Sequence, residues 1–406
     1  MRSIVTRLVI VCLCALGVVL PARAGGSAYS LYGIGDLEIS PAGRSMGMGG
    51  LFASLWSTSS IFPQNPASWS ASKTTKLQGM FGYDNIATHS TNDRALYGEG
   101  GMRGMAISLP LSAPYGITMA MGLSPLSSVR YALDLGVQSL SDSITYVAQH
   151  TGNGGLSTFF LGSSYAPLSW LSVGAAIEYN FGAITRNVDL LFNSSSGYNH
   201  TSISTRYAPD GFDARLAAMC SFENLTAGVT VRTPSVMRTE YRRTYLATTF
   251  GAADTAITAA YNQDLPLSYT AGASYRYRDF LFGAEYGAED WSGVQINGAH
   301  PGELRASSTL GIGLERIGNG LGTGLDRWSY RAGVRTRTNY VTVNGAAISE
   351  WMVTAGAGIP INNQSTVDVA LQYGSRGTTD NGNLLENVFR LSGTLTINEM
   401  WFQKPD

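Results

Sequence analysis

Hydrophobic and polar positions alternate along most of the chain, most clearly between Val173 and Ala183. One set of alternate positions in this stretch is apolar, and the other set carries small, polar or charged side chains such as Glu178 and Asn180. Successive side chains of a β-strand point to opposite faces, so a repeat of two residues predicts a strand with one apolar face.

The same pattern recurs from Leu77 onward. It predicts fourteen strands, at residues 76–84, 101–109, 115–134, 156–166, 171–186, 213–222, 225–233, 266–278, 280–290, 305–316, 328–339, 348–359, 366–376 and 387–398. An even number of strands is typical of bacterial single-chain barrels. The fold class that we expect is all-β, a transmembrane antiparallel β-barrel of 14 strands.

The connections between the expected strands alternate in length. Short links at 110–114, 167–170, 223–224, 278–279 and 360–365 alternate with long ones at 135–155, 187–212, 234–266 and 288–304. Membrane barrels have short periplasmic turns and longer loops outside, whereas a periplasmic β-sandwich, the competing interpretation, need not show this asymmetry.

The N-terminus predicts export from the cytoplasm. Residues 1–24 combine two arginines, an apolar stretch from Leu8 to Leu20 and the small-residue site Ala22-Arg23-Ala24, which is typical of a secretory signal peptide. Residues 25–75 lack sustained alternation and include the glycines Gly47, Gly49 and Gly50. We expect a compact, turn-rich unit there, ahead of a barrel formed by residues 76–406.

Composition supports the membrane assignment. Charged residues make up only 14% of the chain, against roughly 25% in soluble domains. Without Arg2, Arg7 and Arg23, the 27 Lys and Arg residues become 24 against 28 acidic residues, a net charge of −4. This balance gives no indication of a nucleic-acid partner. No apolar run of about 18 residues follows the signal peptide, so we expect no membrane helix.

Charges on the polar faces are expected to point into the barrel, because a charge facing the bilayer midplane costs roughly 2–4 kcal/mol. Inside, acids and bases can pair, and arginine, with its forked set of donors, favours a dense network or contacts with a plug; the alternative is that these charges simply line a hydrated interior. Tryptophans are expected in two belts, with Trp170, Trp328 and Trp401 at the short-turn end and Trp291 and Trp351 towards the long loops. The charges expected in the lumen are Glu178, Arg232, Arg276, Glu285, Arg335, Asp368 and Arg390.

Signatures of catalysis are missing from the sequence. The four histidines are isolated, and neither a zinc-binding His motif nor a Gly-x-Ser-x-Gly elbow occurs. Only Cys220 remains after signal-peptide removal, which excludes an internal disulfide and a cysteine-based metal site. We therefore expect no cofactor, no metal site and no catalytic residue, although an enzyme site assembled at a barrel rim from distant residues is a third, weaker alternative.

Several segments in a fixed order resemble the FadL-type outer-membrane transport family, in particular its Bacteroidetes and Chlorobi branch. The resemblance covers nearly the whole mature chain, and its tail, with Trp401 and Phe402 ahead of four further residues, departs from barrels that end on an aromatic residue. The segments are SLYGIGDLE (Ser30 to Glu38), GRSMGMGG (Gly43 to Gly50), QNPASW (Gln64 to Trp69), SSYAPLSWLSVGAAIEYNFG (Ser163 to Gly182), ALQYGSRGT (Ala370 to Thr378) and INEMWFQK (Ile397 to Lys404).

The resemblance implies that residues 25–75 fold into the barrel as a hatch, with Asn65, Pro66 and Ala67 as its recurring turn. It also implies lateral exit through a kinked third strand. Here Pro125 lies in the expected third strand, and proline cannot donate to a β-ladder. Gly122, Ser124 and Pro125 are therefore the expected lateral gate, unless Pro125 sits in a loop between two shorter strands.

The resemblance also implies passive transport of hydrophobic or amphipathic small molecules, similar to long-chain fatty acids, across the outer membrane of a Gram-negative bacterium. The expected partners are outer-membrane lipids and a hydrophobic small-molecule ligand. A binding or scaffold component of a protein secretion system is the alternative function, since some relatives with this barrel act with secretion proteins.

Overall fold

The computed structural model describes residues 23–24, 26–90, 94–141, 144–193, 199–247, 255–298, 303–362 and 365–399. Nearly all of the expected signal peptide, and the C-terminal tail with Trp401 and Phe402, lie outside these ranges. In the described part of the chain, no helix is long and apolar enough to cross a membrane.

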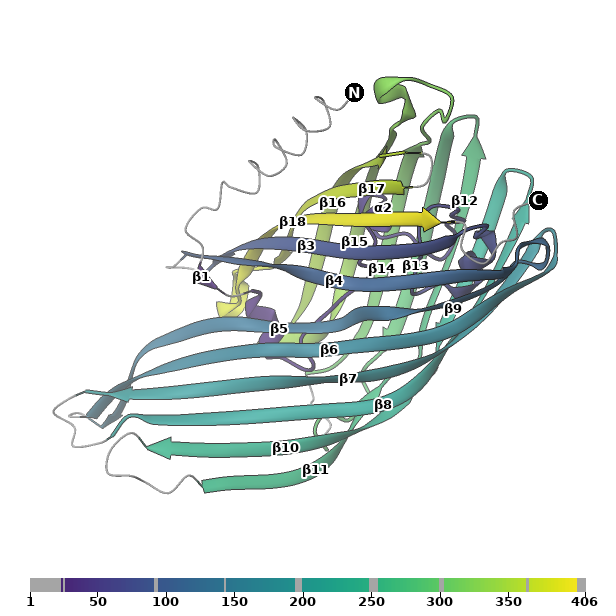
Figure 1. Ribbon diagram of the computed structural model, residues 1–406. Coiled ribbons are helices and arrows are strands. Elements are labelled where there is room, and N and C mark those ends of the chain that lie inside the picture. The colour runs from purple at the N-terminus through teal and green to yellow at the C-terminus, as the bar shows by residue number, and fades with distance from the viewer. Residues whose placement is uncertain are drawn as a thin grey trace.

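A closed antiparallel barrel is the body of the structure (Figure 1). Consecutive strands pair with one another, and the last strand returns to pair with the first, from Leu385↔His89 to Glu399↔Thr75. The wall consists of β3 (Thr75–His89), β4 (Arg94–Ser112), β5 (Ile117–Ser141), β6 (Ile144–Leu168), β7 (Leu171–Phe192), β8 (Thr201–Phe222), β9 (Leu225–Arg232), β10 (Ser235–Ala247), β11 (Thr255–Leu265), β12 (Ser268–Tyr277), β13 (Phe280–Asp290), β14 (Ala306–Arg316), β15 (Ser329–Val343), β16 (Ala346–Pro360), β17 (Ser365–Gly377) and β18 (Leu385–Glu399).

Two of the wall strands are each broken into two segments. Strand β8 pairs with β9 over one part of its length and with β10 over the rest. In the next strand of the wall, β12 pairs with β9 and β11 pairs with β10. The breaks fall at Thr233–Pro234 and at Pro266–Leu267, where proline lacks the N–H that a ladder requires. Counting each broken pair as one strand gives fourteen, which confirms the expected barrel and each of its strands.

The strands are longer than the alternation predicts. Strands β5 and β6 each contain 25 residues and β7 and β8 each contain 22, whereas about 9–11 residues cross a bilayer. Most of the residues expected in the long connections 135–155, 187–212 and 234–266 are therefore strand, and together they extend past the other strands (Figure 1). Beyond the membrane a strand needs no apolar face, so its alternation is weak.

Aromatic side chains mark two levels on the outside of β7 and β8. Near the short β6–β7 turn, the rings of Trp170 and Phe222 stack at 5.3 Å. Farther along the same strands, Tyr179 packs against Phe181 at 5.5 Å and against Phe212 at 4.8 Å. The nine to eleven residues between Trp170 and this second cluster match the length of a membrane-crossing strand.

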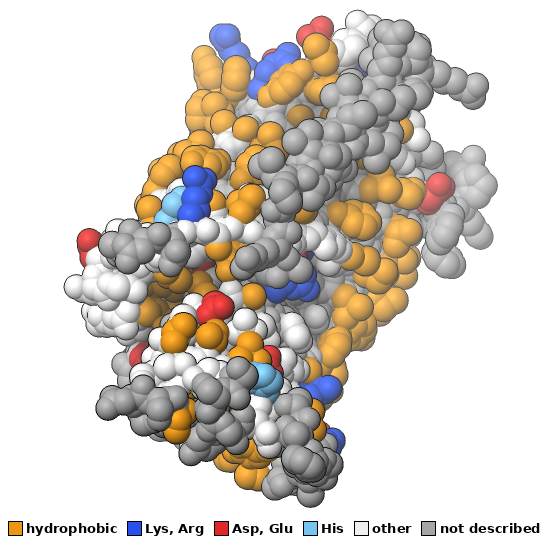
Figure 2. Space-filling view, turned by 90° about the vertical axis from the view of Figure 1, so that its left-hand side faces the viewer, with side chains coloured by type: hydrophobic (Ala, Val, Ile, Leu, Met, Phe, Trp, Pro, Cys, Tyr) orange, Lys and Arg blue, Asp and Glu red, His pale blue; other side chains and the backbone are white. Residues whose placement is uncertain are grey.

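Exposed apolar side chains are spread over the outside of the wall (Figure 2). Between the two levels, Ile177 is 63% exposed and Leu216 is 52% exposed. Trp351, at 47% exposure, also lies on the outside. Trp291 does not belong to a belt: it is fully buried against Tyr340, with ring centroids 4.6 Å apart. Its place in a loop that folds inward, which the sequence does not reveal, overrides the preference of indole for the interface.

Residues 26–74 occupy the inside of the barrel. They form η1 (Ala28–Leu31), β2 (Asp36–Leu37), α2 (Gly43–Gly47) and η2 (Pro66–Ala71), joined by turns; three further 3-10 turns, η3 (Ala113–Tyr115), η4 (Gly324–Arg327) and η5 (Asp380–Gly382), lie between wall strands. Met48, Leu51, Leu55 and Phe62 of this inner segment have no exposed surface. The apolar core of the molecule thus lies between residues 26–74 and the inward face of the wall.

Candidate functional site in the barrel lumen

The inward face of the wall carries most of the charged side chains singled out from the sequence. Glu178, Arg232, Glu285, Arg335 and Asp368 are each between 2% and 5% exposed. Buried charges of this kind need partners, and the structure supplies them from neighbouring strands and from the inner segment, residues 26–74.

A first cluster joins α2 of the inner segment to three wall strands. The Glu315 carboxylate of β14 accepts Arg44 Nη2 at 2.6 Å and Arg331 Nε of β15 at 2.7 Å. The Arg331 guanidinium also pairs with Asp368 of β17 at 2.5 Å. The Glu315 and Arg331 side chains are 3% and 5% exposed, so Glu315 neutralises two buried cations at once.

A second cluster holds the beginning of the inner segment. Arg376 of β17 pairs with Asp36 at 2.9 Å and with Glu386 of β18 at 3.0 Å. The Glu386 carboxylate also accepts the backbone N–H of Ala28 at 2.7 Å. Tyr29 donates its hydroxyl to the carbonyl of Leu384, and burial, with the negative charge of Glu386 nearby, raises the pKa of Tyr29 to about 12. The tyrosine therefore stays a neutral donor across the physiological pH range.

A third cluster joins the inner segment to the first two strands and the last. Arg103 of β4 pairs with Glu38 at 3.0 Å and with Asp84 of β3 at 3.1 Å. Asp84 in turn accepts Arg390 of β18 at 2.7 Å. Arg390 thus lies in the lumen, where the alternation places it, and helps to bridge the point at which the barrel closes.

The remaining predicted lumen charges divide into paired and exposed residues. Glu178 accepts a two-pronged contact from Arg215, at 2.6 and 3.0 Å, and Glu285 accepts the backbone N–H groups of Phe52 and Ser54 at 2.9 and 2.8 Å. Arg276 departs from the prediction. It is exposed, two residues before the turn at Arg278, and its Nε donates to the carbonyl of that residue. The alternation shows which face of a strand a residue occupies, but it does not show how close that residue lies to the rim of the barrel.

Glycines let the inner segment approach the wall closely. Gly49, in the left-handed region at φ +71°, lies so close to β14 and β15 that an added Cβ would stand 2.7 Å from the carbonyl oxygen of Val334. A Cβ on Gly228 of β9 would stand 2.0 Å from the carbonyl oxygen of Ala53. Gly47 is the last residue of α2, and Gly50 lies in the turn that follows it. Gly49 and Gly228 thus allow backbone-to-backbone contact that a larger residue would prevent.

The Asn65-Pro66-Ala67 turn is bound to the wall inside the lumen, close to the start of β7. Asn65 caps η2 through its side-chain oxygen, and its amide nitrogen donates to the carbonyls of Phe52 and Ala53, both at 2.9 Å. Pro66 packs against Gly174 of β7. Ala67 accepts the Ser172 hydroxyl at 2.6 Å. The turn therefore ties two parts of the inner segment to each other and to the wall.

The ladder between β4 and β5 is incomplete. These strands pair from Ser112↔Ile117 to Met105↔Leu123, and among the described residues no further pair joins them. Gly122 lies inside the last paired stretch, whereas Ser124 and Pro125 lie just beyond it, where the β5–β6 register also shifts. Pro125 is thus within β5 and not in a loop. We call this interruption the β4–β5 seam.

Residues of the inner segment fill the β4–β5 seam (Figure 1). β2 pairs with Ser127 and Ser128 of β5, and the Ser30 hydroxyl accepts the N–H of Arg130 at 3.1 Å. Two contacts cross the seam directly: Glu99 of β4 pairs with Arg130 at 3.2 Å, and Tyr97 donates to the carbonyl of Ala132 at 2.7 Å. The inner segment thus substitutes for the missing strand pairs.

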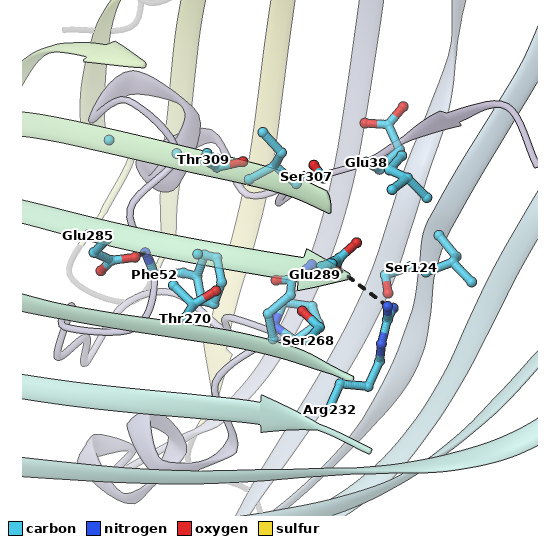
Figure 3. A pocket seen from close by; sticks show the side chains of 18 of the residues that line it. Glu38, Phe52, Ser124, Arg232, Ser268, Thr270, Glu285, Glu289, Ser307 and Thr309 are labelled. Carbon is cyan, nitrogen blue, oxygen red and sulfur yellow. Dashed lines mark hydrogen bonds and ion pairs between the residues drawn. The ribbon is translucent and has the colours of Figure 1, made fainter. Parts of the chain in front are cut away.

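A small polar cavity remains in the lumen, about 120 Å³ in volume (Figure 3). Ser124 and Pro125 line it at the seam, Phe52 and Gln64 line it from the inner segment, and Arg232 lines it from the wall. Arg232 pairs only loosely with Glu289, at 3.4 Å. Drug-sized ligands occupy roughly 300–1,000 Å³, so a long-chain molecule does not fit while residues 26–74 stay in place.

Several charged residues of the lumen were missed by sequence reasoning. Arg331 lies four residues from Arg335 and Glu386 four residues from Arg390, so the alternation already places both pairs on one face. The same alternation places Glu315 and Glu350, with their partners in the wall, on the inward face. Arg44, Asp36 and Glu38 could not be found this way, because the inner segment has no regular period.

The model of the BamG family matches residues 4–406, and the chain belongs to this family. A comparison with curated proteins finds no match.

Solved structures share the fold. A Pseudomonas aeruginosa FadL homologue has a TM-score of 0.65 at 12% identity, with 90% of this chain and 100% of that chain covered. The CymD monoaromatic hydrocarbon channel has a TM-score of 0.59 at 16% identity, with 90% and 98% covered. The Ralstonia pickettii toluene transporter TbuX has a TM-score of 0.57 at 14% identity, with 87% and 97% covered. The chain thus has the same β-barrel fold as this FadL homologue and these channels.

Proposed function

We propose that the protein carries hydrophobic or amphipathic small molecules, such as long-chain fatty acids, across the outer membrane, and that residues 26–74 act as a movable hatch. The single observation that carries this proposal is the β4–β5 seam, an interruption of the wall that is filled by chain and lined by the lumen cavity. The folds of hydrocarbon channels and transporters named above agree with it.

A molecule would enter the lumen, displace part of the hatch and leave sideways at Gly122, Ser124 and Pro125. Lateral exit suits an apolar cargo because it avoids transfer through water. The hatch must move for this, since the cavity of about 120 Å³ is too small for a long acyl chain. The placement of the chain in the Bacteroidetes and Chlorobi branch stays a prediction from the motifs.

Uptake into proteoliposomes tests this function. Purified protein in vesicles should raise the entry rate of a fatty acid or an aromatic hydrocarbon severalfold over that of empty vesicles. A hydrophilic sugar of similar mass serves as the control and should stay outside, because the hatch closes the aqueous pore. Entry rates equal to those of empty vesicles across a panel of both hydrophobic classes would reject transport.

A second function is favoured by how firmly the hatch is held. Buried ion pairs connect it to strands around the barrel, and β5–β8 with β10–β11 form a sheet that extends well beyond the membrane level. We propose, as the alternative, a scaffold that binds secretion-system proteins through this sheet. Affinity purification from native membranes distinguishes the two: stoichiometric protein partners support the scaffold, and co-purified hydrophobic ligand supports transport.

A further inference from the structure

The wall has a second interruption, several strands away from the β4–β5 seam. The neighbouring strands β9–β10 and β11–β12 break at Pro234 and Pro266. On one side of the breaks, β12 pairs with β13 up to Ser268↔Glu289. On the other side, β11 turns away with β10, and within the described residues no ladder joins β11 to β13.

In the described part of the connection between β13 and β14, residues 291–298 and 303–305, two backbone hydrogen bonds cover part of the edge that β11 leaves open. Asp264 donates its N–H to the carbonyl of Gln295 at 2.9 Å, and Gly298 donates to Asn262 at 3.0 Å. Nearer to Pro266 a hollow of about 770 Å³ remains. We call this hollow the Pro266 opening.

Residues from both faces of the wall line the Pro266 opening. Tyr286 and Ala288 lie on the outward face of β13, whereas Glu289 and Ser307 lie on the inward face with the lumen residues. Since successive residues of a strand point to opposite sides, a hollow that touches both sets lies where the wall is interrupted. The hollow therefore passes from the outside towards the lumen.

The lumen cavity and the Pro266 opening meet. Ala288, Glu289 and Ser307 line both spaces, and Figure 3 shows Glu289 and Ser307 beside the lumen cavity, with the Glu289 carboxylate turned towards Arg232. These three residues therefore lie between the large outer hollow and the small inner cavity. A larger side chain at Ala288 would fill the space at this boundary.

The chemistry of the Pro266 opening is amphipathic. Its outer rim carries exposed apolar side chains, with Val236 at 67%, Leu267 at 49% and Tyr286 at 47%. Val236 lies beside Phe212, whose carbonyl accepts the Ser235 hydroxyl at 2.8 Å, and therefore at the outer aromatic level. The rim thus faces the boundary between acyl chains and headgroups.

The polar part of the Pro266 opening is more acidic than basic. Asp264, Asp290 and Glu289 line it, with Arg305 as its only lining cation among the described residues. Glu289 is already engaged by Arg232 and by the indole N–H of Trp291. Asp264 accepts the backbone N–H of Gln295 at 3.2 Å. Asp290 is exposed and accepts hydrogen bonds from Ser292 of its own loop. Among the described residues neither aspartate has an ion-pair partner, so both leave negative charge available to an occupant.

We propose that the Pro266 opening is a binding site for a single-chain amphiphile with a cationic headgroup, with its chain along the apolar rim and its head at Asp264 and Asp290. The volume is within the roughly 300–1,000 Å³ of small-molecule sites. Binding at this site requires no transport. Only the purpose of the site, as an entry point from the outer leaflet to the lumen cavity, rests on the proposed function.

A long-chain amine with a diazirine in its chain, added to proteoliposomes and activated by light, tests the site. The label should concentrate on peptides containing Val236 and Leu267. Ala288→Trp should reduce this labelling at least tenfold, whereas the matched Ala284→Trp, on the same outward face of β13, should leave it unchanged. The Asp264→Asn and Asp290→Asn double variant should reduce it at least threefold, which provides a test if Ala288→Trp fails to fold.

Even labelling of all lipid-facing strands, or undiminished labelling of a folded Ala288→Trp variant, would overturn the site. Equal labelling by the carboxylate analogue of the probe would overturn the assignment of the headgroup. Uptake is measured on the same samples to separate the two proposals. Loss of uptake with retained labelling counts against transport alone, and loss of labelling with retained uptake counts against the Pro266 opening alone.

Discussion

Replacement of Glu315 by glutamine should release the hatch more than any other single change in its ion pairs. Glu315 is 3% exposed and accepts both Arg44 of the hatch and Arg331 of the wall, at 2.6 and 2.7 Å. Glutamine has nearly the same shape but no charge. The guanidinium groups of Arg44 and Arg331 then lose the anion that they share, and Asp368 remains as the acid that pairs with Arg331.

Breaking a buried ion pair by removing one partner costs about 3–5 kcal/mol. If the pair exists only while the hatch is seated, this cost raises the population with a displaced hatch by about 10²-fold to several thousandfold, since 1.4 kcal/mol is a factor of about ten. Part of the cost is also felt by the wall through Arg331, so the lower end is the expected value.

Trypsin cleavage after Arg44 measures this population, because the Arg44 side chain is only 11% exposed while the hatch is seated. When opening is fast compared with cleavage, the cleavage rate follows the population of the open form. We expect Glu315→Gln to be cut about 10²-fold faster than the parent protein. Glu240→Gln, an exposed acid on β10, is the matched control. Equal rates for all three proteins would refute the clamp role of Glu315.

Two further changes test the contacts between hatch and wall. Gly228→Val would place a side chain against the carbonyl oxygen of Ala53, a backbone atom that cannot move alone. Overpacking costs about 1–3 kcal/mol, so hatch cleavage should rise at least fivefold. Gly393→Val, with open space around its Cβ, should be cleaved at the rate of the parent protein. Arg130→Glu would set like charges across the β4–β5 seam at Glu99; because Arg130 is 45% exposed, the effect is limited to about 1 kcal/mol, and fatty-acid uptake should rise up to fivefold. Unchanged uptake would show that the seam is not the exit.

The barrel could be predicted from the sequence because lipid on one side and packed chain on the other force a strict alternation. The alternation from Val173 to Ala183 shows this constraint directly, and the same alternation places Glu178 and Asp368 on the inward face of the wall. The continuation of β5–β8 beyond the membrane could not be predicted, since no lipid selects an apolar face there. Trp291 and Arg276 show the same limit: their surroundings depend on a folded loop and on distance from the rim.

The inner segment is less predictable for a different reason. Its residues are held by contacts from sites hundreds of positions away, such as Ala28 with Glu386 and Gly49 with Thr354. The glycines and the Asn65-Pro66 turn indicate a compact unit, but nothing local indicates which strands it touches. The incomplete β4–β5 ladder is similarly hidden, although Pro125 marks its position.

A reversible covalent lock on the hatch shows whether the hatch must move for transport. The hydroxyl oxygens of Ser70 in η2 and Ser172 in β7 are 2.7 Å apart in the buried lumen, so cysteines at these two positions would bring their sulfur atoms together, as a disulfide requires. Ser70→Cys and Ser172→Cys are combined with Cys220→Ser, so that no other thiol of the mature chain competes.

Fatty-acid uptake by this variant is measured in proteoliposomes under oxidising and then reducing conditions. Uptake should be lost when the disulfide forms and should return when it is reduced, while the cysteine-free Cys220→Ser protein should transport under both conditions. Full uptake through the oxidised, cross-linked protein would contradict the account, because transport would then proceed with the hatch in place.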